Sequence, residues 1–71
     1  MPTTIKTETA GSIWKLHVAK GDPVEAGQEL MIMEVMKMEV PYEAPAAGVI
    51  AALHVVEGDV VEEDQVVMEI G

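Results

Sequence analysis

The 71-residue chain contains no cysteine, no arginine and no phenylalanine, and it has one tryptophan and one tyrosine. Without cysteine it can form neither a disulfide nor a thiolate metal site, and this absence favours a reducing compartment. With so few aromatic rings, a folded core has to be built from aliphatic side chains and methionine. No apolar run approaches the ~20 residues that a membrane-spanning helix needs.

Positive charge is also scarce, because four lysines stand against thirteen acidic residues and the net charge is −9. Such a chain is repelled by phosphate backbones and by anionic membranes, so we expect neither nucleic acid nor a membrane as a partner. Residues 1–6 lack the apolar stretch of a secretory signal, which predicts a cytoplasmic protein. The length suffices for one small domain, predicted to be monomeric and to cover residues 1–71.

An internal duplication organises the chain. Shifting the sequence by 37 positions aligns the residues from Ala10 onward with those from Ala47 onward. The identical pairs are Ala10-Gly11 with Ala47-Gly48, Ile13 with Ile50, Leu16-His17-Val18 with Leu53-His54-Val55, Gly21-Asp22 with Gly58-Asp59, Val24-Glu25 with Val61-Glu62, Gln28 with Gln65, and Met31 with Met68. The match predicts two similar halves, related by an approximate two-fold axis and closed around one core.

The local pattern within each half is that of β-strands. Residues 13–18 alternate apolar and polar side chains apart from Trp14, and β-branched residues are frequent. Turn signals recur about every ten residues, and no long helical periodicity is present. Gly27 of one half aligns with Asp64 of the other, and both residue types tolerate a positive φ. The pattern predicts an all-β barrel or sandwich of short strands, with Pro41 and Pro45 at edge or loop positions.

The midpoint of the duplication is predicted to be a hairpin with unusual turn residues. We expect a strand over residues 30–35 that returns over residues 38–42, with Met36 and Lys37 at the tip. A two-residue turn needs positive φ and normally recruits Asn-Gly or another pair that contains glycine. When residues that disfavour positive φ occupy such a turn, the choice of residues indicates a functional requirement and not a folding preference.

The same register places Glu34 opposite Glu39, where like charges cost roughly 0.2–1 kcal/mol. Either the two carboxylates lie on a solvated face without further role, or a partner recognises them, and the sequence leaves both interpretations open. Met36 and Met38 flank the lysine at a position where exposed apolar groups contribute little to folding. We therefore expect these flexible side chains to form a contact surface for a partner. The remaining strand methionines are predicted to fill the core: Met31, Met33 and Met68.

The segment Met36-Lys37-Met38 resembles the attachment site of the biotinyl (biotin carboxyl carrier) family, whose Met-Lys-Met signature is commonly flanked by glutamate. The duplication and the two Gly-Asp turns also fit the biotinyl/lipoyl pattern, so the resemblance covers nearly the whole chain. It implies a flattened β-barrel of two four-stranded antiparallel sheets with quasi-two-fold symmetry. The modified lysine then lies at one end of the barrel and both termini at the other. Val35 departs from the pattern, since that position is usually alanine.

The resemblance implies that Lys37 is the covalent attachment point for biotin. Met36 and Met38 would be the flanking motif, and Glu34 and Glu39 would be recognised by biotin protein ligase. The attached biotin would act as a swinging arm that takes a carboxyl group from a biotin carboxylase to a carboxyltransferase. The acceptor would be an acyl-CoA, as in acyl-CoA carboxylase, or a keto acid, and the sequence leaves both open. The chain is therefore expected to be a carrier and not an enzyme, because the cofactor and the partner enzymes supply the chemistry.

Three alternatives stand beside this interpretation. A lipoyl carrier shares the fold but usually has Asp-Lys-Ala at the tip, and a dual biotin/lipoyl attachment protein would accept both cofactors. An enzyme or metal protein is disfavoured: His17 and His54 occur singly at duplicated positions without cysteine, and Ser12 is the only serine. Asp22 and Asp59 follow glycines and are explained by turn chemistry. A non-carrier interaction module is the third alternative.

Overall fold

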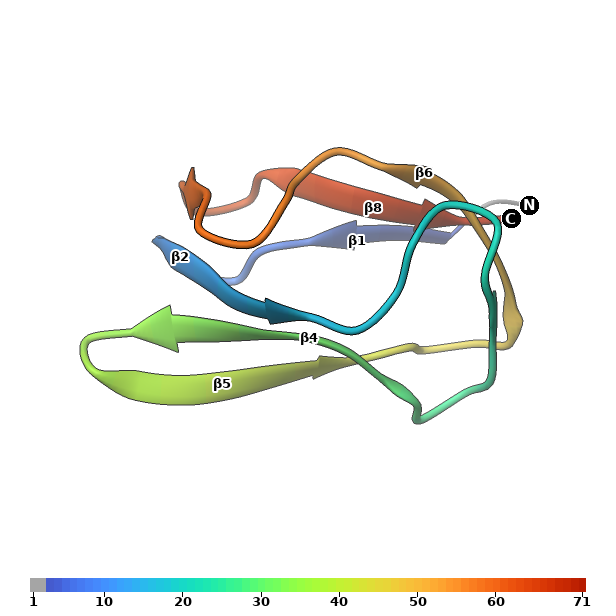
Figure 1. Ribbon diagram of the computed structural model, residues 1–71, viewed down its shortest axis with the longest axis horizontal. Helices are drawn as coiled ribbons and strands as arrows, with labels where there is room; N and C mark the ends of the chain where they lie inside the picture. The colour runs from blue at the N-terminus through green and yellow to red at the C-terminus, as the bar shows by residue number, and fades with distance from the viewer. Residues whose placement is uncertain (1–2) are drawn as a thin grey trace.

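Eight short strands form two antiparallel sheets in the computed structural model, which describes residues 3–71 (Figure 1). In chain order the strands are β1 (Thr3–Lys6), β2 (Gly11–Leu16), β3 (Pro23–Val24), β4 (Glu29–Val35), β5 (Met38–Glu43), β6 (Gly48–Leu53), β7 (Val60–Val61) and β8 (Val66–Ile70). One sheet has the order β1-β8-β6-β3 and the other has the order β5-β4-β2-β7. The predicted class, an all-β flattened barrel of two four-stranded sheets, is confirmed.

The duplication is visible in the way the strands pair. Each sheet takes two strands from β1–β4 and two from β5–β8, so the two halves interleave and neither completes a sheet alone. The ladder between β2 and β4 shifts register between Ile13 and Lys15, and the ladder between β6 and β8 shifts between Ile50 and Ala52. Those two irregularities are 37 residues apart, so the predicted quasi-two-fold relation extends to the β-bulges.

The strand predicted over residues 13–18 was displaced by two residues, since β2 covers Gly11–Leu16. The bulge explains the break in alternation at Trp14, because this residue is the extra one between the paired positions Ile13 and Lys15. Both Trp14 and Lys15 are exposed, whereas Ile13 is buried. Pro41 lies in β5, an edge strand, and Pro45 lies in the loop after it, as expected.

The core is duplicated almost residue by residue. Its buried equivalent pairs are Ile13 and Ile50, Val18 and Val55, Val24 and Val61, Leu30 and Val67, Met31 and Met68, and Met33 and Ile70. Met31, Met33 and Met68 have no exposed surface, so their predicted role as core filler is confirmed. Both sheets contribute the same kinds of aliphatic side chain to the interlocking inner faces, and the partly buried Tyr42 packs against this core.

The molecule is elongated, with extents of 32 × 18 × 17 Å. The hairpin of β4 and β5 projects at one end, and the described chain begins and ends at the other, where Thr3 pairs with Ile70 (Figure 1). The predicted placement of the hairpin opposite the ends of the chain is therefore confirmed. Residues 3–71 include no helix with the length and apolar character needed to cross a membrane.

Candidate functional site

The tip of the β4–β5 hairpin is a two-residue turn made by Met36 and Lys37. Val35 pairs with Met38 across the turn, which is the predicted register. Met36 has a φ of 51° and Lys37 a φ of 66°, so both central residues adopt the left-handed conformation that such a turn requires. Each left-handed non-glycine residue costs roughly 1–2 kcal/mol, which the pairing of the two long strands must offset.

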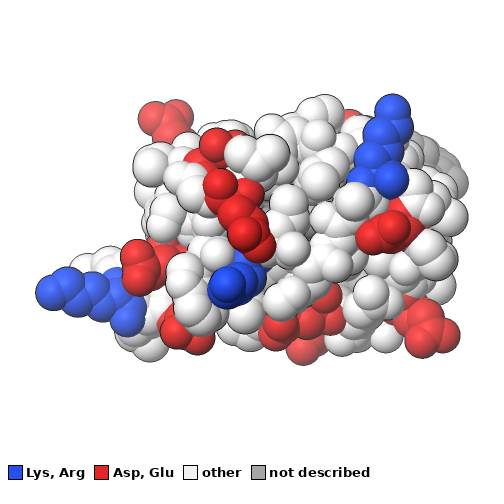
Figure 2. Space-filling model, in the orientation of Figure 1, with Lys and Arg blue, Asp and Glu red and all other residues white. Residues whose placement is uncertain are grey.

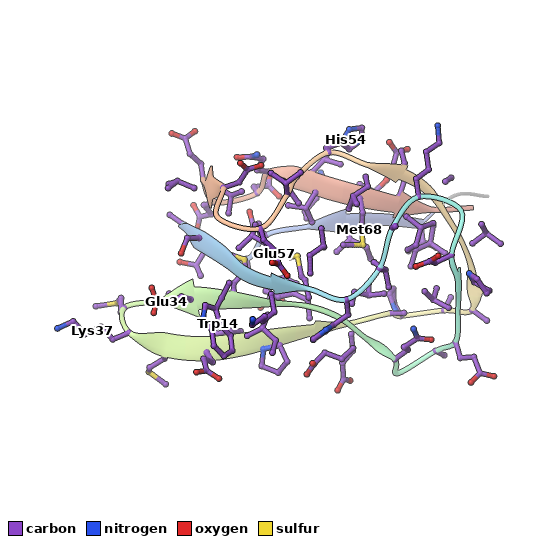
Figure 3. All side chains as sticks on the ribbon, viewed as in Figure 1. Trp14, Glu34, Lys37, His54, Glu57 and Met68 are labelled. Atoms are coloured by element: carbon purple, nitrogen blue, oxygen red, sulfur yellow. The ribbon has the colours of Figure 1, made fainter. Side chains whose placement is uncertain are left out.

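The side chains of the turn point away from the body of the domain. Met36 is 91% exposed and Met38 is 67% exposed, so their predicted exposure is confirmed. Lys37 extends beyond the rest of the molecule (Figure 3), and Figure 2 shows a lone basic side chain reaching past the surface at the same end. Within residues 3–71 its ammonium group forms no hydrogen bond and no ion pair. The amine is therefore open to a large partner from most directions.

A row of outward-facing residues crosses the base of the hairpin. Glu39 pairs with Glu34, Glu34 with Ser12, and Ser12 with Val60, so the row runs across β5, β4, β2 and β7. Both glutamates are exposed, and neither is paired with a cation among the described residues. The predicted apposition of two like charges is confirmed. The outer face next to the lysine consequently has a concentrated negative charge.

Close packing holds β2 against the hairpin beside this row. A Cβ atom at Gly11 would lie 2.5 Å from the backbone oxygen of Glu34. The equivalent position in the other half is Gly48, where a Cβ atom would lie 2.5 Å from the side chain of Ile70. A side chain at Gly11 would therefore push β2 away from the end of β4 and loosen the support of the tip.

The two histidines are separate and each pairs with a different carboxylate. The His17 ring lies 2.8 Å from a carboxylate oxygen of Glu29, and the His54 ring lies 3.1 Å from one of Glu69. Both pairs are exposed. Among residues 3–71 no three histidine or acidic side chains gather into a group that could hold a metal ion. The same part of the chain forms no pocket.

The aspartates that follow glycine stabilise turns, as expected. A carboxylate oxygen of Asp22 accepts a hydrogen bond from the backbone N–H of Ala19 at 2.9 Å. The duplicate residue Asp59 accepts one from the N–H of Val56 at 3.0 Å. Both carboxylates satisfy backbone donors of their own loops, which accounts for these residues in structural terms.

Thr7 has a structural role that the sequence did not reveal. It is only 3% exposed, and its hydroxyl donates to the backbone oxygen of Glu62 and accepts from the N–H of Gln65. Its duplicate is the buried Ala44, which offers no hydroxyl, so the duplication gave no signal for this contact. Thr7 fastens the segment after β1 to the turn between β7 and β8.

The arrangement suits a covalently attached group better than a bound one. A small barrel without a pocket offers few contacts to a free ligand. An exposed primary amine at the end of a paired hairpin can form an amide, and an acyl group joined there would extend away from the domain. These features define a small domain with one lysine exposed at the tip of a paired hairpin.

The chain belongs to the biotin/lipoyl family, whose model, described as a biotin-requiring enzyme, matches residues 1–70. It is 51% identical over 41 residues to a biotin/lipoyl attachment protein of Bacillus subtilis, a match that covers 58% of this chain and 56% of that protein. It is 44% identical over 41 residues to the urea amidolyase of Saccharomyces cerevisiae, where the match covers 58% of this chain and 2% of that protein. The matched region is thus just over half of the Bacillus protein and a small part of the yeast one.

Two solved structures contain a domain of the same shape. A single-chain, multi-domain long-chain acyl-CoA carboxylase superposes with a TM-score of 0.89 at 25% identity, over 96% of this chain and 7% of that one. The urea carboxylase of Kluyveromyces lactis superposes with a TM-score of 0.90 at 34% identity, over 100% of this chain and 6% of that one. The chain is therefore a biotin/lipoyl attachment domain that resembles domains of multi-domain carboxylases.

Proposed function

We propose that Lys37 carries biotin through an amide bond and that the chain is the carrier component of a cytoplasmic biotin-dependent carboxylase. The observation that carries this proposal is the two-residue turn, which holds Lys37 at a positive φ between two exposed methionines. The similarity to domains of an acyl-CoA carboxylase and a urea carboxylase supports biotin as the attached group. The domain itself is proposed to perform no catalysis.

The chain exposes the Lys37 amine, and the partner enzyme has to activate it. An alkylammonium is protonated at neutral pH and must lose a proton before its nitrogen can attack a carboxyl carbon. Among residues 3–71 no carboxylate or imidazole contacts the Lys37 amine. We therefore assign the proton acceptor, and the activation of the carboxyl group as an adenylate that loses AMP, to biotin protein ligase.

The hairpin also fixes where the modified side chain is delivered. Biotin supplies a ureido nitrogen that accepts and donates a carboxyl group, and the protein supplies binding and orientation. Strand pairing up to Val35 and Met38 holds the base of the side chain, so its mobility begins at Lys37. Tethering raises the local concentration of the group at a biotin carboxylase and at a carboxyltransferase when the domain is held near both.

The residues around the lysine are proposed to serve recognition. Met36 and Met38 offer flexible, polarisable contact surface to an enzyme that encloses the tip. Glu34 and Glu39 place two exposed carboxylates at the base of the same hairpin, where a ligase with basic side chains would meet them. Folding alone does not need these carboxylates opposite each other, which favours recognition over the solvated-face interpretation.

Lipoylation is the second candidate function, because the Bacillus relative is a biotin/lipoyl attachment protein. Co-expression with biotin protein ligase in one culture and with lipoate ligase in another, followed by intact-mass measurement, separates the two cofactors. We expect one biotin per chain, and none on a Lys37→Arg variant. A Lys20→Arg variant, at an exposed loop lysine, is the matched control and should be modified normally. An unmodified wild-type chain in both cultures would refute the carrier function.

A further inference from the structure

The two sheets have matching frameworks but different outer faces. Lys15 pairs with Ile32 and Ile32 with Pro41 in one sheet, and a 37-residue shift takes Lys15 to Ala52 and Ile32 to Glu69. The structure confirms the equivalence, because Ala52 pairs with Glu69 at the same place after the bulge. The fold is therefore satisfied by either set of side chains, and the difference between them needs another explanation.

On the outer face of one sheet, three apolar side chains and one lysine occupy positions where the other sheet has small or polar residues. We call this set the outer-face patch: Trp14, Lys15, Ile32 and Pro41. Its equivalents on the other sheet are Ala51, Ala52, Glu69 and Thr4. Trp14 is 43% exposed, and it is the extra residue of the bulge between Ile13 and Lys15, beside the pair of Lys15 and Ile32 (Figure 3).

The Trp14 ring has a contact partner within its own strand. The Lys15 ammonium lies 5.5 Å from the centre of the Trp14 ring, in a cation–π arrangement. The bulge fixes the backbone that carries both side chains. An aromatic side chain held in one orientation loses little conformational entropy when it becomes buried in an interface, which makes it an efficient anchor.

The charges around the outer-face patch determine what can cover it. Glu34 and Glu39 lie in the neighbouring row, and the Glu57 carboxylate accepts a hydrogen bond from the N–H of Leu16, close to Trp14 (Figure 3). A second copy of this chain would bring another net charge of −9 against this rim. The complementary occupant is an apolar protein surface bordered by lysine or arginine.

The distance to Lys37 favours the enzyme that modifies this lysine. Lys37 follows Ile32 by five positions, which is about 17 Å at most at roughly 3.3 Å per strand residue. An interface of ~800 Å² per partner covers both. A ligase must bring its catalytic centre to a side chain only one lysine long, so its footprint has to include the hairpin. An enzyme that acts on the far end of an attached cofactor has no such constraint.

We propose that the outer-face patch is the docking surface for the ligase that acylates Lys37, and that the ligase meets it with an apolar surface rimmed by basic side chains. This inference rests on the proposed function. The patch is remote from the reacting nitrogen, so it contributes to binding and not to the chemical step.

The test replaces the patch with residues that the fold already accommodates at the equivalent places. The variant carries Trp14→Ala, Ile32→Glu and Pro41→Thr, after the residues at positions 51, 69 and 4. We expect the KM of biotin protein ligase for the carrier to rise about 10-fold or more, the scale of a tryptophan anchor, with kcat unchanged. Circular dichroism and thermal melts establish that the variant is folded, and Trp14→Ala alone should raise KM in the same direction.

The matched control is Val49→Ala, which removes a side chain of nearly the same exposure, 44%, from the outer face of the other sheet. It should leave KM unchanged. An unchanged KM for the triple variant would overturn the docking surface while leaving the carrier function intact. A wild-type chain modified by neither ligase would overturn both. A wild-type dimer that the triple variant abolishes would overturn it in favour of self-association.

Discussion

The turns of this domain fall into two kinds, and the difference separates folding from function. The turn before β4 has Gly27 at a φ of 85°, and the equivalent turn before β8 has Asp64 at a φ of 62°. These are residue types that reach the left-handed region at little cost. The tip of the β4–β5 hairpin uses the same region with Met36 and Lys37, neither of which is suited to it.

The ordinary turns are also supported by side chains. The Gln28 side-chain oxygen accepts a hydrogen bond from the N–H of Glu25 at 3.0 Å, and that of Gln65 accepts one from the N–H of Glu62 at 3.0 Å. At the tip no side chain of the described residues supports the turn in this way. The tip keeps its shape only because two long paired strands enforce it, which leaves its side chains free for a partner.

Replacing Met36-Lys37 with Asn-Gly should produce the largest change. Asparagine and glycine reach the left-handed region at little cost and are the preferred residues of such a turn, so the exchange is expected to stabilise the domain by about 1–2 kcal/mol. For a domain of this size that corresponds to a melting temperature higher by roughly 4–8 °C per kcal/mol. Thermal unfolding followed by circular dichroism measures it. An unchanged or lower melting temperature would show that the tip is not strained.

Substitutions in the turns before β4 and β8 should change the stability of the domain less, and the two substitutions should differ in size. Gly27→Ala should destabilise the domain by about 1 kcal/mol, because alanine is strained at positive φ. Asp64→Gly, the reverse kind of change at the duplicate position, should alter stability by only a few tenths of a kcal/mol, about the cost of extra chain entropy. Urea unfolding of both variants compares them directly. Equal losses would contradict the explanation that alanine is strained at this position and glycine is not.

Neutralising Glu39 with Glu39→Gln should have the smallest effect on stability. Relief of the repulsion from Glu34 is expected to stabilise the domain by a few tenths of a kcal/mol, given solvent screening. The rate of modification by biotin protein ligase at limiting carrier concentration should fall at the same time. Glu63→Gln, an exposed carboxylate in the turn before β8, is the matched control. A faster reaction of the Glu39 variant would contradict a role for this charge in recognition.

The architecture could be predicted from the sequence because its determinants are local or repeated. The 37-residue match located both halves, and the register from Val35 to Met38 followed from the strand lengths around the tip. A positive φ at Gly27 and Asp64 was expected from their residue types and from their alignment in the duplication, and the structure confirms both. Each of these inferences needed only neighbours along the chain or a second copy of the same pattern.

The parts that were missed depend on contacts between distant segments. Trp14 broke the alternation of β2, but that break does not reveal a bulge without knowledge of the partner strand. Thr7 is fastened to residues more than fifty positions away, and its duplicate lacks the hydroxyl. The outer-face patch became visible only when strand pairing showed which residues are equivalent between the sheets. The attachment role of Lys37 is a prediction that the intact-mass measurement tests.

The position of β8 sets when the lysine can become a substrate. This last strand lies between β1 and β6, and it supplies the buried Val67, Met68 and Ile70. The tip is synthesised before the strand that completes the core, and the pairing of β1 with β8 joins residues far apart in the sequence, which makes it slow to form. Modification should therefore follow the pairing of β8 with β1 and β6, and a chain that ends before residue 66 should stay unmodified.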